Sequence, residues 1–351
     1  MKYCLVGDRT SIHLKKWESY LHEQGHETYY VDTSGGQQGG SESNIISIKF
    51  DRMGKLLIFF QMLRVAWFVL KNQIKVVDVH YVGLNSVVSF LTLGAMRVAT
   101  CHGSDIHTDP YRSRLLRWAT WIELLRANLI FVSGRPLSQE LKKIYPTIDE
   151  KKIIPYSPGV NLDVFRTCSR GTKKYDFIST RLMQEKYAIL QMIEGLIKLK
   201  QIGFVFKVAL VVTKPNATYL ELIKTKISQA LSDEVDFFPE LPQEKIATLY
   251  NASAFSLHFP YGESIGLSVI ESTLCDCFPI TLGHAAYMDY MDANDMIIAR
   301  SVSAADLMES MKTALQGDFR VSQSLKQRLA ELHSSPTNYM RNLALISAAR
   351  K

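Results

Sequence analysis

A strand, a sharp break and a helix follow one another around residues 262–272, GESIGLSVIES. Residues 255–259 alternate as a strand does, Pro260 and Gly262 interrupt them, and apolar residues then recur at helical spacing over 267–274. A strand that enters a helix through such a loop is a unit of an open α/β sheet. The loop therefore lies at the carboxyl end of a strand, where these sheets bind ligands.

The start of this helix is suited to an anion. The first free backbone N–H groups are expected to be those of Ser264, Ile265, Gly266 and Leu267. Glu263 and Glu271 flank them and would repel a diphosphate by about 1 kcal/mol even in water, so we expect both to face hydroxyl groups. The combination suggests a phosphorylated sugar. The alternative is that both glutamates are ordinary solvated residues.

A second segment supplies positive charge. The strand predicted over 175–179 is followed by Arg181 and Lys186, just past its carboxyl end. Arginine can hold a diphosphate through two parallel hydrogen bonds, and lysine adds a point charge. The cations and the carboxylates together predict one binding site.

Four motifs in order resemble retaining glycosyltransferases of family 4. They are TCHGSDI at 100–106, IIPYSPGVNLDVF at 153–165, TRLMQEKY at 180–187 and ESIGLSVIES at 263–272. The resemblance implies the α/β fold called GT-B, in which two Rossmann-like doubly wound parallel-sheet domains face each other across a cleft. The chain departs from the family pattern at Tyr187 and Ser268, and Gly283-His284 replaces a glycine pair.

The domain organisation follows from the same resemblance. Residues 1–166 would form the acceptor domain and 167–336 the donor domain, with the polar segment 167–174 as their boundary. A terminal helix at about 337–351 would pack back on the first domain.

The resemblance also implies roles for single residues. Arg181 and Lys186 would hold the donor diphosphate, Glu271 the ribose, and Glu263 with the backbone after it the sugar and diphosphate. Leu241 would contact the base, although a core leucine is the alternative. His102, accompanied by Gly103 and Asp105, would approach the donor sugar, and His13 and His80 would contact the acceptor. A histidine with a structural role is the alternative for each.

The implied activity is that of a metal-independent retaining hexosyl- or N-acetylhexosaminyltransferase. The donor would be a nucleoside-diphosphate sugar, UDP favoured over GDP, and the acceptor a glycan hydroxyl, on a lipid-linked or surface polysaccharide intermediate. The leaving diphosphate would take the acceptor proton. No Asp-x-Asp motif and no His/Cys set at ligand spacing is seen in the sequence, so we expect no metal and no cofactor.

Three other functions compete with this one. Neither half has a G-x-G-x-x-G turn after its first strand, which argues against a dinucleotide-dependent oxidoreductase. An inactive GT-B partner that only binds sugar nucleotide is compatible with the departures at Tyr187 and His284. A GT-B epimerase fits the four motifs less well.

Composition and cysteine usage indicate the compartment. The 351 residues and 47% hydrophobic content fit two sizeable cores. Five cysteines without a CxxC pair, and a first strand that starts at once, predict a cytoplasmic protein with reduced thiols and no cleaved signal peptide. Residues 55–70 are strongly apolar but contain Gln61 and Arg64, so we expect a helix packed on the first sheet rather than a membrane span.

Charge is concentrated in the first half of the chain. Residues 1–166 contain 21 Lys and Arg against 15 Asp and Glu, and 167–351 contain 20 against 19. Arg112, Arg114 and Arg117 lie beside Trp118 and Trp121, a combination that suits the anionic inner face of the cytoplasmic membrane. An ordinary solvated helix face explains it equally well. No recognition motif supports nucleic-acid binding.

Overall fold

The computed structural model describes residues 1–34, 44–48, 55–168 and 173–350. They divide into two compact units, one formed by Met1–Pro158 with Pro336–Lys351 and the other by Gly159–Ser335. The boundary expected at 167–174 therefore falls inside the second unit. Most of the Gly/Ser-rich segment 33–43, for which the sequence predicts a loop, lies outside the described residues.

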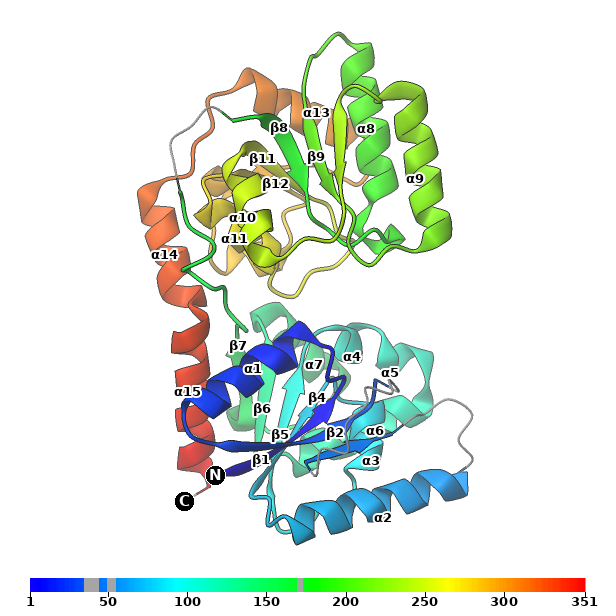
Figure 1. The fold of residues 1–351 in the computed structure, drawn as a ribbon, viewed down its shortest axis with the longest axis vertical. Coiled ribbons are helices and arrows are strands. Elements are labelled where there is room, and N and C mark those ends of the chain that lie inside the picture. The colour runs from blue at the N-terminus through cyan, green and yellow to red at the C-terminus, as the bar shows by residue number, and fades with distance from the viewer. Residues whose placement is uncertain (35–43, 49–54, 169–172, 351) are drawn as a thin grey trace. The chain divides into compact units, whose positions relative to one another are not determined.

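The first unit contains seven parallel strands in the order β3-β2-β1-β4-β5-β6-β7 (Figure 1). Their bounds are β1 Lys2–Gly7, β2 Glu27–Asp32, β3 Ile45–Ser47, β4 Val76–His80, β5 Met96–Cys101, β6 Leu129–Ser133 and β7 Ile153–Tyr156. The helices are α1 Ile12–Glu23, α2 Lys55–Lys71, α3 Leu84–Val88, α4 Ser104–His107, α5 Asp109–Arg112, α6 Arg114–Arg126, α7 Arg135–Ile144 and the C-terminal α15 Ser335–Ala349. Strands β4 and β6 are buried throughout, as expected for parallel strands covered on both faces.

The second unit has six parallel strands in the order β10-β9-β8-β11-β12-β13. Their bounds are β8 Tyr175–Ser179, β9 Val208–Val211, β10 Val235–Phe238, β11 Ser253–His258, β12 Phe278–Thr281 and β13 Ile297–Ile298. The α-helices are α8 Ile189–Gln201, α9 Ala217–Ala230, α10 Gln243–Asn251, α11 Leu267–Leu274, α12 Ala285–Met288, α13 Ala304–Gln316 and α14 Gln323–His333. The expected two doubly wound parallel sheets are confirmed.

Both sheets reverse their strand order at an inner pair, β1 with β4 and β8 with β11. Loops that leave the carboxyl ends of these strands diverge, and the crevice between them is where open α/β sheets bind ligands. The chemistry-bearing loops expected from the sequence follow β5, β8 and β11. Each therefore starts at or beside a switch point.

Helix α15 belongs to the first unit. The ring of Tyr339 lies 5.4 Å from that of Trp17 and 5.6 Å from that of Tyr20, both on α1. Ile346 is also buried in this cluster. The last helix thus adds aromatic and aliphatic surface to the core under α1.

Some elements differ from the sequence expectation. The apolar run 204–212 favours a strand, but the strand forms only over Val208–Val211, and Val205, outside it, is 93% exposed. The helix α2 forms as expected, and Val65, Phe68 and Val69 on one of its faces join the core. None of the described helices combines the length and hydropathy that crossing a membrane requires.

Candidate functional site

An arginine and a glutamate meet at the carboxyl end of the second sheet. Arg181 follows β8, Glu263 follows β11, and Arg181 Nη2 lies 2.7 Å from Glu263 Oε2. The hydroxyl of Tyr287, on α12, accepts from the same Nη2 at 3.3 Å and donates to Glu263 at 3.5 Å. The sequence assigned Arg181 and Glu263 to separate parts of a ligand. The structure instead pairs them with each other.

The pair is largely buried, with side-chain exposures of 10% for Arg181 and 13% for Glu263. Burial, the largest single influence, lowers the pKa of Arg181, but the Glu263 carboxylate together with Tyr287 and Tyr187 outweighs it, and the net pKa is raised. Arg181 Nε also donates to His258 Nδ1 at 3.2 Å. Burial, and then the arginine charge, hold the pKa of His258 well below its usual range, so this histidine is a neutral acceptor.

Gly266 precedes the first turn of α11 with φ of +76°, a left-handed conformation that glycine adopts readily. A Cβ atom there would lie 2.4 Å from Tyr287 Cε1. The glycine therefore allows Tyr287 to pack under the loop while its hydroxyl reaches Arg181. The same residue keeps side-chain atoms away from the N–H groups that begin the helix.

Lys186 is exposed and lies on the short 3-10 turn Glu185–Tyr187. Its carbonyl oxygen accepts from the N–H of Tyr261 at 2.9 Å, which joins the loop after β8 to the loop after β11. Lys186 Nζ is 5.1 Å, and the Arg181 guanidinium 5.6 Å, from the ring centre of Tyr187. Tyr187, which departs from the family pattern, thus has its ring within cation–π distance of both side chains.

The two residues expected at the nucleoside end lie on the same edge of the sheet. Glu271 is partly buried in α11, and it contributes, after burial, to the raised pKa of Tyr250. Leu241 is partly buried in the loop between β10 and α10, rather than in the core.

In the first unit, three histidines gather at the carboxyl ends of β1, β4 and β5. His80 Nδ1 lies 3.0 Å from His102 Nε2, within hydrogen-bond distance, and the His102 ring stacks on those of His13 and His80 at 5.1 and 5.2 Å. Tyr81 stacks on His102 at 4.2 Å. Burial, followed by the charges of His13 and His80, holds the pKa of His102 well below its usual range. The structure therefore brings the three predicted histidines together.

A buried aspartate supports this cluster. Asp78 Oδ2 lies 3.2 Å from His80 Nε2 and accepts from Trp17 Nε1 at 3.1 Å, while Oδ1 accepts from Thr100 at 2.8 Å. The contact with His80 Nε2 is at ion-pair distance but lacks hydrogen-bond geometry. Asp78 thereby joins α1 and β5 to β4, the strand that carries His80.

The loop after β5 is closed by Asp105. Its Oδ1 accepts from the N–H groups of Gly103 at 2.8 Å and of His102 at 3.1 Å. Burial raises the pKa of Asp105 to about 6, although these backbone donors act in the opposite direction. Asp105 thus holds its own loop.

Comparisons with known proteins bear on the fold of the chain. The model of the family "Glycosyl transferase 4-like" matches residues 2–133. A glycosyltransferase from Rickettsia africae ESF-5 is 17% identical with a TM-score of 0.76, and the alignment covers 100% of this chain and 98% of that one. Anabaena HepE, solved in complex with UDP and glucose, is 13% identical with a TM-score of 0.77, over 99% and 100% of the two chains.

The chain has the GT-B fold. The same fold occurs in the UDP-GlcNAc 2-epimerase from Methanocaldococcus jannaschii, which is 12% identical with a TM-score of 0.63 over 99% of this chain and 100% of that one. A comparison with the sequences of curated proteins found no match. The similarity thus shows the fold, and activity, donor, acceptor and stereochemistry are argued from the site.

Sequence reasoning missed three residues that contact the predicted ones. Tyr287 and His258 surround Arg181, and Asp78 supports His80. His258 and Asp78 lie in strands that are almost wholly buried, and an ionisable residue in such a strand is a usable signal. Nothing in the segment around Tyr287 marks it.

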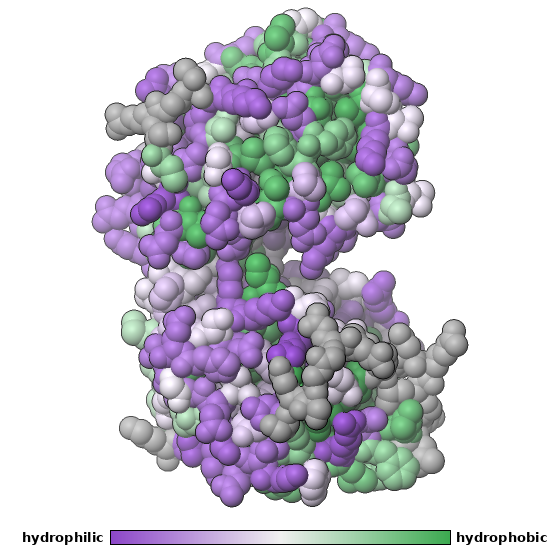
Figure 2. Space-filling model, in the orientation of Figure 1, coloured by the Kyte–Doolittle hydropathy of each residue, from purple (hydrophilic) through white to green (hydrophobic). Residues whose placement is uncertain are grey.

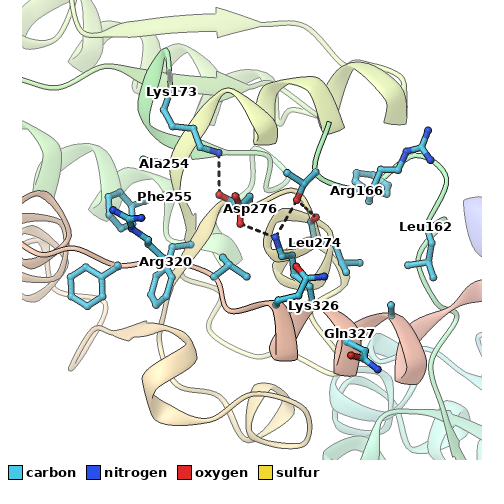
Figure 3. A pocket seen from close by; sticks show the side chains of 17 residues that line it. Leu162, Arg166, Lys173, Ala254, Phe255, Leu274, Asp276, Arg320, Lys326 and Gln327 are labelled. Atoms are coloured by element: carbon cyan, nitrogen blue, oxygen red, sulfur yellow. Dashed lines mark hydrogen bonds and ion pairs between the residues drawn. The ribbon is translucent and has the colours of Figure 1, made fainter. Parts of the chain in front are cut away.

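A cavity of about 1020 Å³ opens at the other end of the second sheet (Figure 3). It lies beside Phe255, near the start of β11, and so opposite the loop that carries Glu263. Lys326 Nζ pairs with Asp276 Oδ1 at 3.0 Å, and Lys173 Nζ donates to the carbonyl oxygen of Asp276 at the same distance. Since the chain itself engages both lysines, we assign no ligand to this cavity.

Proposed function

We propose that this protein is a retaining glycosyltransferase that moves a hexosyl or N-acetylhexosaminyl group from a UDP-sugar to a glycan hydroxyl. The observation that supports it best is Arg181, a permanently charged and buried guanidinium at the switch point of the second sheet, beside the open start of α11. Anabaena HepE, of the same fold, is solved in complex with UDP-glucose.

In this proposal each described group has one task. Lys186 and the N–H groups of Ser264 to Leu267 bind the diphosphate, and Arg181 turns from Glu263 towards it. Glu263 then accepts from the hydroxyls of the donor sugar, Glu271 from those of the ribose, and Leu241 covers the base. Arg181 exchanges Glu263 for the diphosphate, and Glu263 exchanges Arg181 for the sugar hydroxyls. Neither buried charge is therefore left without a partner.

The reaction proposed is a displacement on one face of the sugar. The bond between the anomeric carbon and the diphosphate oxygen breaks, the acceptor oxygen forms its bond from the same side, and the acceptor proton passes to the leaving diphosphate. Arg181 and Lys186 stabilise the charge that develops on that leaving group, a contribution that is worth about 2.7 to 4 kcal/mol for one well-placed donor. His102, neutral and within hydrogen-bond distance of His80, would approach the donor sugar, and His13 would contact the acceptor.

We further propose a cytoplasmic protein that acts at the inner face of the membrane on a lipid-linked or surface polysaccharide intermediate, without a metal. Among the described residues, no group of three or more His, Cys, Asp or Glu side chains is arranged to hold a metal ion. The test of metal independence is turnover in the presence of a chelator, and loss of turnover that Mg²⁺ or Mn²⁺ restores would contradict it.

The decisive experiment measures release of nucleoside diphosphate from a panel of UDP- and GDP-sugars by the purified protein. Lys186→Ala is expected to lower the rate by at least about 100-fold, because an exposed cation can be removed without disturbing the core. Lys198→Ala removes another exposed lysine of the same unit, on α8, and should leave the rate unchanged. Equal rates for the wild type and Lys186→Ala would refute the assignment.

An inactive sugar-nucleotide-binding partner is the second candidate. It is favoured by the Arg181–Glu263 pair, which a diphosphate must separate before Arg181 can act. Thermal stabilisation by UDP without release of UDP from any UDP-sugar would identify such a binder; a ligand at about 100 times its Kd adds about 2.7 kcal/mol. An epimerase would instead convert the donor into its isomer.

A further inference from the structure

Helix α2 exposes a stripe of large apolar side chains. Val65, Phe68 and Val69 turn inwards, whereas the outward side carries Leu57, Phe59, Phe60, Leu63, Trp67 and Leu70, all between 43% and 66% exposed. Figure 2 shows apolar residues gathered at the lower right of the molecule, where Figure 1 places α2. The expectation that this helix would pack on the sheet thus accounts for only one of its two faces. An apolar stripe of this size on a monomer marks an interaction site.

Helix α6 also exposes large apolar side chains. The short helix α3 packs against both α2 and α6, and on α6 Leu115 is 67% and Trp118 54% exposed. We call the exposed residues Phe59, Phe60, Leu63, Trp67 and Leu70 of α2, with Leu115 and Trp118 of α6, the α2–α6 face. Trp121, by contrast, donates its Nε1–H to Thr147 at 3.0 Å and is only partly exposed.

The exposed charges that the structure describes on α2 and α6 are basic. On α2 the described charged side chains are Arg64 and Lys71, both exposed, and Lys71 Nζ lies 4.7 Å from the ring centre of Trp67. On α6, Arg114 and Arg117 are exposed, while the single acidic residue, Glu123, is buried against Arg97. The balance of charged residues over each whole unit agrees with this. The first unit has 23 Lys and Arg against 14 Asp and Glu, whereas the second has 18 against 20.

These features select a lipid surface over a second copy of the chain. A two-fold dimer through this face would bring Arg64, Lys71 and Arg114 of both copies towards each other, which like charges oppose. Tryptophan and phenylalanine with flanking lysine and arginine are the residues that favour the boundary between acyl chains and anionic headgroups. A helix that cannot cross the bilayer would lie in that boundary.

We propose that the α2–α6 face docks this protein on a bilayer that contains anionic lipid, with α2 lying in the headgroup layer. The Trp67 and Leu63 side chains enter the acyl boundary, and Arg64, Lys71, Arg114 and Arg117 contact the headgroups. The proposal goes beyond sugar transfer and does not depend on it, because none of these residues lies at the site around Arg181 or His102.

The test is flotation of the full-length protein with vesicles of phosphatidylcholine alone or mixed with phosphatidylglycerol. The wild type is expected to float with the mixed vesicles and much less with the neutral ones, and added salt should weaken binding. The double variant Leu63→Gln with Trp67→Gln should bind at least about tenfold more weakly, because it loses the apolar contacts. A matched control, Val205→Gln with Leu222→Gln, changes two exposed apolar residues of the second unit and should bind like the wild type.

Several outcomes would overturn the proposal. These are absence of binding to both kinds of vesicle, equal binding by the wild type and the Leu63/Trp67 variant, and equal binding to neutral and anionic vesicles. A concentration-dependent dimer that the Leu63/Trp67 variant abolishes, without vesicle binding, would assign the face to a second copy. Donor hydrolysis without vesicles should be the same in the variant and the wild type, so failure of the docking proposal is distinguishable from failure of the proposed transferase activity.

Discussion

At the scale of single residues, the pairing of Arg181 with Glu263 changes what a substitution at either position measures. Both side chains are largely buried, so Glu263→Ala leaves a buried guanidinium with only Tyr287 and His258 as neutral partners. Loss of one member of a buried ion pair costs about 3 to 5 kcal/mol. A loss of turnover in Glu263→Ala therefore mixes catalysis with folding, whereas Lys186→Ala is free of this effect.

We expect Glu263→Ala to lower the free energy of unfolding by about 3 kcal/mol, and Glu263→Gln by less, since the amide oxygen still accepts from Arg181. Denaturant titration of the three proteins measures both differences. UDP should restore more stability to Glu263→Ala than to the wild type, because its diphosphate finds Arg181 without a competing carboxylate. If UDP stabilises both equally, Arg181 does not bind the diphosphate.

At the scale of elements, the loop after β5 makes stability depend on pH. The pKa of Asp105 is about 6 in the folded protein and about 3.8 in an unfolded chain, because the carboxyl group is buried. The folded state therefore holds this proton more tightly. Its contribution to stability is fully present below pH 3.8 and is lost as the pH rises through about 6, by about 2 to 3 kcal/mol at most.

Asp105→Asn keeps an oxygen that accepts from the N–H groups of Gly103 and His102 but has no proton to lose. Between about pH 4.5 and 7, its unfolding free energy should rise relative to that of the wild type. Asp149→Asn provides the control, because Asp149 also accepts a backbone N–H, from Lys151, but is exposed. A difference between Asp105→Asn and wild type that does not change with pH would contradict the prediction.

Sequence patterns predicted the secondary-structure elements better than they predicted the contacts between side chains. The spans 175–179 and 267–274 form as expected, since short apolar runs bounded by Gly, Pro or charged residues have few alternatives. The two-residue strand β13 has too little sequence to show a pattern. The pairing of Arg181 with Glu263 was also not predictable, because the two residues join only when β8 and β11 become neighbours in the sheet.

At the scale of the whole molecule, the two segments that connect the units are hydrogen-bonded to each other. The N–H of Val160 donates to the carbonyl oxygen of His333 at 2.7 Å, and that of Ser335 donates to the carbonyl oxygen of Val160 at 3.2 Å. Gly159 has φ of +73°, and a Cβ atom there would lie 2.5 Å from Ser335 Cα. The two connecting segments can therefore approach each other only because residue 159, the first residue of the second unit, has no side chain.

Gly159→Ala should lower the free energy of unfolding by about 1 to 2 kcal/mol from the left-handed backbone alone, and further because two backbone segments must separate. Gly203→Ala isolates the first contribution, because Gly203 also has a positive φ, of +92°, but has no atom within 4 Å of an added Cβ. Denaturation of the two variants measures the difference, which we assign to the close approach of the connecting segments. If Gly159→Ala lowers the free energy of unfolding no more than Gly203→Ala does, the two segments separate without cost. The hydrogen bonds between them then contribute nothing measurable to stability.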